Sequence, residues 1–294
     1  MSNIVKELGG VYPALLTPFT KENTVNRKVL EELVEYNIQK GVKGFYVGGS
    51  TAEAFLLTEA ERNEIYEIVA NKAAGRVKLL AHVGSISTDQ AVRFAQRAKE
   101  LGYDAVSAVC PFYYGFTFAE IKQYYQDIID RSEMPMVMYY IPGTSGVKFS
   151  TAQIAEILNN DMVIGLKHTS NDYFALERVK TQFPEKVIFN GFDEMFLCGI
   201  SMGADGGIGS TYNYMAEKFL KIQKLYSENK MAEALAVQHE ANHIIKILID
   251  LGGMQMNKEV LCQMGFDFGN ARAPFIELTQ EQKDLIRREV TNKL

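Results

Sequence analysis

The residue best suited to chemistry lies where a run of β-forming residues stops at a lysine. Residues 163–167 are mostly apolar up to Lys167, and Ser170 or Asp172 can then cap a helix. A strand that turns into a helix here places the amine at the carboxyl edge of a sheet, where α/β proteins bind ligands. Burial there lowers the pKa of an amine, and a neutral amine can attack a carbonyl carbon to form a Schiff base. Taken alone, the stretch favours the alternative, a lysine that is paired with a carboxylate or solvated.

Two other predicted strands end in groups that could assist such an amine. Residues 44–47 lead through two glycines to Ser50 and Thr51, whose hydroxyls and nearby backbone N–H groups can bind a carboxylate or a phosphate. Another strand ends at Tyr139 and Tyr140, of which one side chain must point inward and could move a proton. Each feature also has an ordinary explanation, a βα turn in the first case and core packing in the second. An amine, an anion site and a phenol together are more specific than any one of them.

The last two predicted strands end in segments suited to a sugar. Residues 187–190 are followed by Gly191 and then by the adjacent carboxylates Asp193 and Glu194, which can bind a polyol or simply open a helix. Residues 206–210 are rich in glycine, so a ligand can approach their backbone closely. Barrels often bind phosphate near this point, but the segment has no lysine or arginine. A neutral sugar therefore fits better than a phosphorylated one.

Apolar strands alternate with amphipathic helices along most of the chain. Strands are predicted at residues 10–19, 44–47, 77–83, 105–109, 136–141, 163–167, 187–190 and 204–209. Helices are predicted at residues 29–40, 58–73, 88–101, 117–131, 150–158 and 216–228, with a further one opening at 173. About eight strand–helix units in roughly 225 residues match the usual size of a (β/α)8 barrel. We therefore predict an α/β fold, a (β/α)8 TIM barrel, with a doubly wound sheet as the alternative.

The pattern changes to helices alone after residue 228. Helices are predicted at residues 231–251, 257–264 and 279–293. We expect residues 1–228 to form the catalytic barrel and residues 229–294 to form a C-terminal helical extension packed on it, within one domain overall.

Composition and charge exclude several classes of function. The chain has 294 residues, 47% of them hydrophobic, and a net charge of −5 without a basic run, which argues against a nucleic-acid partner. Its three cysteines are widely spaced and suggest neither a disulfide framework nor a zinc site. The N-terminus lacks the apolar segment of a signal peptide, and no apolar run is long enough to span a membrane. We expect a cytoplasmic protein that acts on a small molecule.

Together these motifs resemble the pyruvate-dependent class I aldolases, the family that includes dihydrodipicolinate synthase, and within it the N-acetylneuraminate lyases. The resemblance extends from about residue 10 through the C-terminal helices. It is carried by GGSTAE at 48–53, YYIPGTSGV at 139–147, GLKHTSND at 165–172, GFDE at 191–194 and GADGGIGSTYN at 203–213.

The resemblance implies a role for each matching residue. Lys167 would form the Schiff base with pyruvate, Tyr139 would donate and accept protons, and Ser50 and Thr51 would hold the pyruvate carboxylate. Tyr113, in CPFYYG, matches a tyrosine that reaches a neighbouring subunit's site in homotetrameric relatives. No metal or organic cofactor is implied. The positions that would hold the sugar portion are Thr169, Gly191, Asp193, Glu194, Gly209 and Ser210.

One division among the relatives and one departure from the family pattern bear on the substrate. Dihydrodipicolinate synthases carry an arginine just after the proline that corresponds to Pro142, whereas residues 143–146 contain none. This favours cleavage of N-acetylneuraminate to N-acetylmannosamine and pyruvate, with a ketodeoxygluconate aldolase or a dihydrodipicolinate synthase-like enzyme as alternatives. Ala52 replaces the second glycine of the turn, and if that position requires a positive φ, alanine costs about 1 kcal/mol or more. Such strain would tilt the carboxylate site.

Other classes of function remain open at the level of the sequence. Residues 239–243 read H-E-x-x-H, the pattern of zinc hydrolases, but no third ligand is well placed. A glycosidase could pair Glu53 with Asp193 or Glu194, although it would leave Lys167 and Tyr139 without a role. A barrel that binds pyruvate without turnover, as a ligand sensor, is a further alternative.

Overall fold

Eight parallel strands close into a barrel in the computed structural model, which describes residues 7–294. The strands are β1 (Val11–Pro13), β2 (Gly44–Val47), β3 (Lys78–His82), β4 (Ala105–Val109), β5 (Met136–Tyr140), β6 (Val163–His168), β7 (Val187–Asn190) and β8 (Gly206–Gly209). Each strand from β2 to β8 pairs with its neighbour in the chain, and β1 pairs with β8. A parallel bridge between Ala14 and Tyr46 joins β1 to β2 and completes the ring. The prediction of a (β/α)8 barrel is confirmed.

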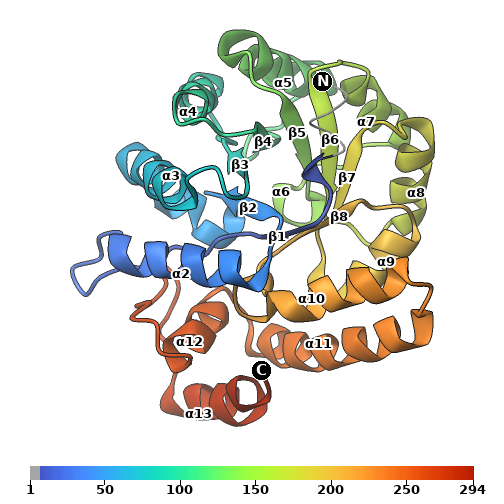
Figure 1. The fold of residues 1–294 in the computed structure, drawn as a ribbon. Helices are drawn as coiled ribbons and strands as arrows, with labels where there is room; N and C mark the ends of the chain where they lie inside the picture. The colour runs from blue at the N-terminus through green and yellow to red at the C-terminus, as the bar shows by residue number, and fades with distance from the viewer. Residues whose placement is uncertain (1–6) are drawn as a thin grey trace.

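A ring of helices covers the outside of the strands (Figure 1). These helices are α2 (Arg27–Lys40), α3 (Glu59–Ala73), α4 (Thr88–Glu100), α5 (Phe118–Ser132), α7 (Thr151–Leu158), α8 (Tyr173–Gln182), α9 (Phe196–Ser201) and α10 (Tyr212–Ser227). Several begin at capping residues that the sequence displays. Thr58, Thr117 and Ser150 each accept a hydrogen bond from a backbone N–H three residues later, in a complete capping box. The Asp172 carboxylate accepts the backbone N–H of Ala175 and so caps α8. Of the two residues proposed for this role, Asp172 and Ser170, the cap is therefore Asp172.

The structure differs most from the sequence prediction at four places, one of which is the last helix, predicted at residues 279–293 but ending at Glu289. β1 ends at Pro13 rather than continuing to residue 19, because the chain leaves the barrel and the Phe19 N–H donates to the carbonyl of Phe268. α10 begins four residues before the predicted start, and non-helical angles at Met215 kink it. A short helix, α6 (Pro142–Ser145), was not expected and follows β5 directly.

Three further helices lie to one side of the barrel. They are α11 (Met231–Leu251), α12 (Gln255–Gln263) and α13 (Gln280–Glu289). α11 runs beside α10, and α13 contacts both α11 and α12 (Figure 1). The boundary at residues 228–229 and the assignment to a single domain stay predictions. No helix between residues 7 and 294 is both long enough and apolar enough to cross a membrane.

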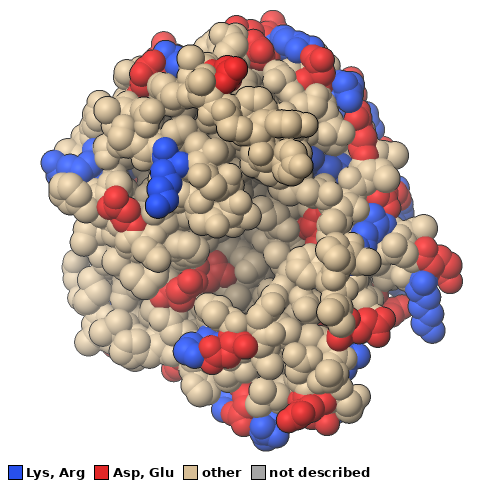
Figure 2. Space-filling model, turned by 180° about the vertical axis from the view of Figure 1, so that it is seen from behind, with Lys and Arg blue, Asp and Glu red and all other residues tan. Residues whose placement is uncertain are grey.

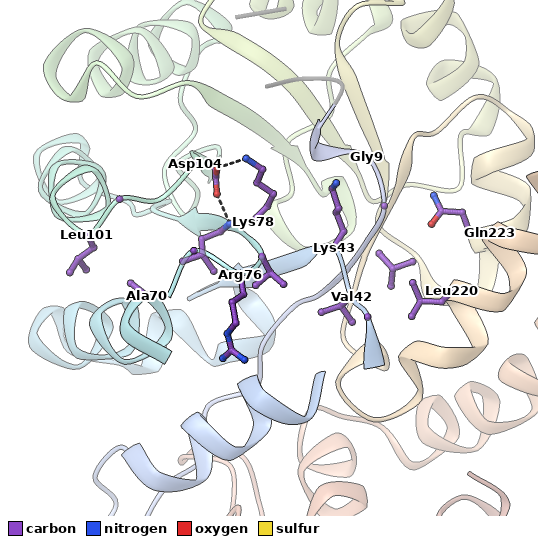
Figure 3. A pocket seen from close by; sticks show the side chains of 17 residues that line it. Gly9, Val42, Lys43, Ala70, Arg76, Lys78, Leu101, Asp104, Leu220 and Gln223 are labelled. Carbon is purple, nitrogen blue, oxygen red and sulfur yellow. Dashed lines mark hydrogen bonds and ion pairs between the residues drawn. The ribbon is translucent and has the colours of Figure 1, made fainter. Parts of the chain in front are cut away.

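The two ends of the barrel differ in character. A pocket of about 570 Å³ lies at the amino ends of the strands, where Lys78 pairs with Asp104 at 2.9 Å and Lys43 and Arg76 line the wall (Figure 3). This end of a barrel usually contributes to stability rather than to catalysis. The face on the far side from Figure 1 is hollowed near its middle, with acidic side chains beside the hollow (Figure 2).

Candidate active site

Lys167 lies near the carboxyl end of β6 and is 4% exposed. The strand register places it between Tyr139 of β5 and Phe189 of β7. Its amine is 4.1 Å from the ring centroid of Tyr139 and 4.3 Å from that of Tyr46 on β2. Within residues 7–294, none of the ion pairs involves this amine. The lysine is therefore enclosed by aromatic rings and is not paired with a carboxylate, contrary to the alternative that the stretch alone favoured.

Burial changes the protonation of this amine. Desolvation lowers the pKa of Lys167 to about 7, although the negative charge of Asp193 acts in the opposite direction. At pH 7 about half of such amines are neutral, compared with about one in three thousand at the ordinary pKa of 10.5. Because only the neutral form is a nucleophile, the gain in reactive amine at neutral pH is about a thousandfold.

Tyr139 occupies the adjoining position on β5 and is the inward-facing member of the tyrosine pair. Burial raises the pKa of its phenol to about 12, while the hydroxyls of Ser50 and Thr169 act to lower it. The phenol is therefore protonated at neutral pH. Tyr140 packs on other groups, with its ring 5.8 Å from Phe149 and 5.7 Å from the His168 ring.

The turn after β2 forms two short 3₁₀ helices, η1 (Ser50–Ala52) and η2 (Ala54–Leu56). The expectation that Ala52 strains this turn was wrong. Ala52 is buried within η1, and the residue with the left-handed conformation is Glu53, at φ 61°. The side chain of Glu53 fixes that conformation. Its carboxylate lies 2.5 Å from the Lys258 amine and accepts the backbone N–H of Arg272 at 2.7 Å. Since the carboxylate is fully buried in these contacts, Glu53 cannot act as a glycosidase acid or base.

The acidic pair lies in a third short helix, η3 (Asp193–Met195), after β7. The Asp193 carboxylate accepts hydrogen bonds from the backbone N–H of Thr211 at 2.8 Å and from its hydroxyl at 2.6 Å. Burial raises the pKa of Asp193 to about 6, and the Lys167 charge partly opposes this. The structure therefore brings Asp193 into electrostatic contact with Lys167, as the strand ends predicted. Glu194 is only partly buried beside it.

Two glycines of the predicted site make room for its side chains. A β-carbon at Gly209 would collide with the Asp193 carboxylate, and one at Gly191 would collide with the Thr169 hydroxyl. Ser210 follows at the end of β8, partly exposed, and its carbonyl accepts the side-chain amide of Asn213 at 2.7 Å. Both glycines are thus explained by packing within the site.

Tyr113 lies apart from this cluster. Its side chain is 85% exposed in the loop after β4, at φ 82°, and its ring centroid is 5.1 Å from that of Tyr114. A large aromatic side chain that is exposed in a left-handed conformation is unusual. The single chain offers it no contact with Lys167.

Tyr46 and Thr211 are parts of the site that the sequence reasoning missed. The ring of Tyr46 faces the Lys167 amine, and its hydroxyl donates to Ser107 at 3.1 Å across the barrel. Tyr46 lies on a predicted strand just before the GGST turn. Its position near the end of that strand is the feature of the sequence that could have indicated a role in the site. Thr211 follows the glycine-rich segment directly, but its bond to Asp193 spans 18 residues and leaves no local pattern.

The H-E-x-x-H sequence is accounted for differently. His239, Glu240 and His243 lie on the exposed face of α11, and the Glu240 carboxylate pairs with Lys218 at 3.0 Å. Within residues 7–294, no group of three or more His, Cys, Asp or Glu side chains is arranged to hold a metal ion.

Comparison with known proteins places this site in a family. The model of the dihydrodipicolinate synthetase family matches residues 7–293. The chain belongs to the dihydrodipicolinate synthetase family. The family resemblance inferred from the motifs is thereby confirmed.

Several proteins that are similar to this chain are named N-acetylneuraminate lyase. N-acetylneuraminate lyase from Citrobacter koseri is 46% identical over 262 residues, which cover 89% of this chain and 88% of that protein. The structure of CdNal from Clostridium difficile in complex with mannosamine is 41% identical, with a TM-score of 0.95, covering 98% of this chain and 99% of its own. N-acetylneuraminate lyase from Fusobacterium nucleatum complexed with pyruvate is 39% identical, with a TM-score of 0.91, covering 97% and 98%.

Proposed function

We propose that this protein is a carbon–carbon lyase, a Schiff-base aldolase that cleaves N-acetylneuraminate to N-acetylmannosamine and pyruvate. The observation that carries the proposal is the Lys167 amine, buried among aromatic rings and largely neutral near pH 7. The names of the similar proteins agree with the activity expected from the sequence.

Catalysis begins with the neutral amine. The Lys167 nitrogen attacks the C2 ketone carbon of open-chain N-acetylneuraminate, and uptake of one proton with loss of one water molecule gives an iminium ion; the final hydrolysis returns that proton. The iminium accepts the electron pair of the C3–C4 bond as that bond breaks, while the C4 hydroxyl loses its proton and becomes the aldehyde of N-acetylmannosamine. Protonation of the resulting enamine at C3 and hydrolysis by one water molecule release pyruvate and the free lysine. The chemistry uses the covalent Schiff base as its electron sink and needs no metal or organic cofactor.

Tyr139 moves the proton. Its pKa of about 12 keeps the phenol protonated at neutral pH, so it is not a standing base. It acts instead as a relay, passing the C4 hydroxyl proton in concert with the substrate carboxylate. The hydroxyls of Ser50 and Thr169 act to lower the pKa of this phenol and so favour release of its proton during the relay.

The remaining site residues bind the two ends of the substrate. Ser50 and Thr51, with the backbone of η1, hold the pyruvate carboxylate. We expect the hydroxyls of the sugar portion to be bound by polar side chains and by backbone groups near the two glycines. These groups are Thr169, Gly191, Asp193, Glu194, Gly209 and Ser210.

The choice of substrate rests on α6. This helix, Pro142–Ser145, carries no arginine to bind a second carboxylate. We therefore expect N-acetylneuraminate to be cleaved in preference to ketodeoxygluconate, and no condensation of pyruvate with aspartate semialdehyde.

We further propose a homotetramer in which Tyr113 contacts a neighbouring subunit, supported by its exposure and left-handed conformation. Light scattering would then give about four times the 33.0 kDa of one chain. We also propose a cytoplasmic location, which the three free cysteines support because the cytoplasm is reducing. Cell fractionation would test this location.

One experiment tests the chemistry directly. The protein is treated with borohydride and labelled pyruvate, and the labelled peptide is identified by mass spectrometry. Label on Lys167, and none in a Lys167→Ala variant, is expected. In parallel, pyruvate release from N-acetylneuraminate is measured beside the same assay with ketodeoxygluconate. Labelling of a different residue, or a Lys167→Ala variant that keeps its activity, would contradict the proposal, and pyruvate binding without release would indicate a ligand sensor.

A further inference from the structure

The helix α11 contributes two side-chain amides to the turn that carries Asp193 and Glu194. Gln238 and Asn242 are four residues apart and lie on the face of α11 that packs against the barrel. Gln238 is 4% exposed, and Asn242 is partly buried. His239, Glu240 and His243 of the H-E-x-x-H sequence lie on the opposite, exposed face of α11.

The two amides form a connected set of hydrogen bonds to the backbone of that turn. The side-chain oxygen of Gln238 accepts the backbone N–H of Leu197 at 2.9 Å. The side-chain nitrogen of Gln238 donates to the backbone carbonyl of Asp193 at 3.1 Å. The same nitrogen donates to the side-chain oxygen of Asn242 at 2.8 Å. The side-chain nitrogen of Asn242 in turn donates to the backbone carbonyl of Glu194 at 2.9 Å. Three backbone groups within five residues are therefore fixed by one helix.

Of these backbone groups, the Asp193 carbonyl also accepts the N–H of Phe196, whereas the Leu197 N–H is bonded by the Gln238 side chain and the Glu194 carbonyl by that of Asn242. η3 is a single turn, and Met195 has non-helical angles (φ −121°, ψ 21°) where η3 meets α9. The Leu197 N–H lies in the first turn of α9, where N–H groups have no partner inside their own helix. A buried backbone group without a partner is costly, so the amides of α11 determine which conformation this irregular segment adopts.

We propose that Gln238 and Asn242 are positioning residues that hold Asp193 and Glu194 in place for the sugar portion of the substrate. The inference rests on the proposed function, in which this acidic pair binds the sugar. It makes α11, outside the eight strand–helix units, part of the specificity of the site. Formation of the Schiff base uses Lys167, which makes no hydrogen bond to either amide, and should not depend on them.

The test measures the two substrates of the reverse reaction separately. Condensation of pyruvate with N-acetylmannosamine is followed for the full-length protein and for its Asn242→Ala and Gln238→Met variants. Loss of one net hydrogen bond corresponds to about a fivefold change in an equilibrium constant, so the KM for N-acetylmannosamine should rise about five- to tenfold. The KM for pyruvate and the yield of borohydride trapping should not change. His243→Ala, an exposed position on the same helix, is the matched control and should resemble the unmodified protein.

The possible outcomes separate this inference from the proposed function. Unchanged KM for N-acetylmannosamine in both variants, with an active unmodified protein, would overturn the positioning role alone. A parallel fall in pyruvate trapping would also overturn it, because it would indicate a general loss of structure. Should Gln238→Met fail to fold, Asn242→Ala decides, since its side chain is only partly buried. An unmodified protein that neither cleaves nor forms N-acetylneuraminate would overturn the substrate assignment, and this inference with it.

Discussion

Replacement of Lys167 by methionine should stabilise the protein, and by more at pH 7 than at pH 9. The pKa of this amine is about 7 in the folded protein and 10.5 when it is solvated. A lysine whose pKa is lowered on folding destabilises the fold at every pH below its unfolded value. The penalty is absent well above pH 10.5, grows as the pH falls, and is complete below about pH 7.

The magnitude follows from the two pKa values. At 1.36 kcal/mol per pKa unit, the penalty is about 4 kcal/mol at pH 7 and about 2 kcal/mol at pH 9. Methionine has a similar length and no charge, so Lys167→Met removes the penalty at both pH values. The gain in the free energy of unfolding should therefore be about 2 kcal/mol larger at pH 7 than at pH 9.

Urea unfolding at the two pH values measures this difference, with all proteins at one concentration because assembly affects apparent stability. Lys28→Met is the matched control, since the Lys28 side chain is 86% exposed, and its effect should not differ between the two pH values. An equal gain for Lys167→Met at pH 7 and pH 9 would refute the reasoning. It would mean that the buried amine keeps its ordinary pKa, and the proposed nucleophile would lose its physical basis.

Three further substitutions test other parts of the site. Tyr139→Phe should lower kcat by about 10²- to 10⁴-fold while borohydride trapping of pyruvate persists; undiminished kcat would exclude the relay. Ala52→Gly should leave the KM for pyruvate unchanged and reduce the free energy of unfolding by roughly 0.5–1 kcal/mol, because the left-handed residue is Glu53; a clearly improved KM would show that alanine does strain the turn. Gly209→Ala places a methyl group against the Asp193 carboxylate and should cost about 1–3 kcal/mol of stability, with weaker sugar binding; normal values for both would mean that Asp193 moves freely.

The sequence predicts the barrel and the strand-end residues because these depend on local patterns. Apolar runs, capping residues and glycines locate the strands and helices to within a few residues, and the parallel order then collects Lys167, Tyr139 and Asp193 at one end. What the sequence did not predict depends on distant partners. The left-handed residue of the turn is Glu53 rather than Ala52 because residues far along the chain hold the Glu53 carboxylate. Similarly, nothing near Gln238 indicates that its amide meets the Asp193 carbonyl, 45 residues away.

The attachment of Glu53 also has a consequence for the order of events during synthesis. Its carboxylate accepts the N–H of Arg272, 219 residues later, so all eight strands are translated before the group that secures the turn exists. Ribosome-bound chains that end before Lys258 should therefore react with pyruvate far less than chains extended past Arg272, although both contain Lys167. Equal labelling of the two nascent chains by pyruvate and borohydride would contradict this. We therefore expect competence for catalysis to arise near the end of translation, when the last helices leave the ribosome and dock.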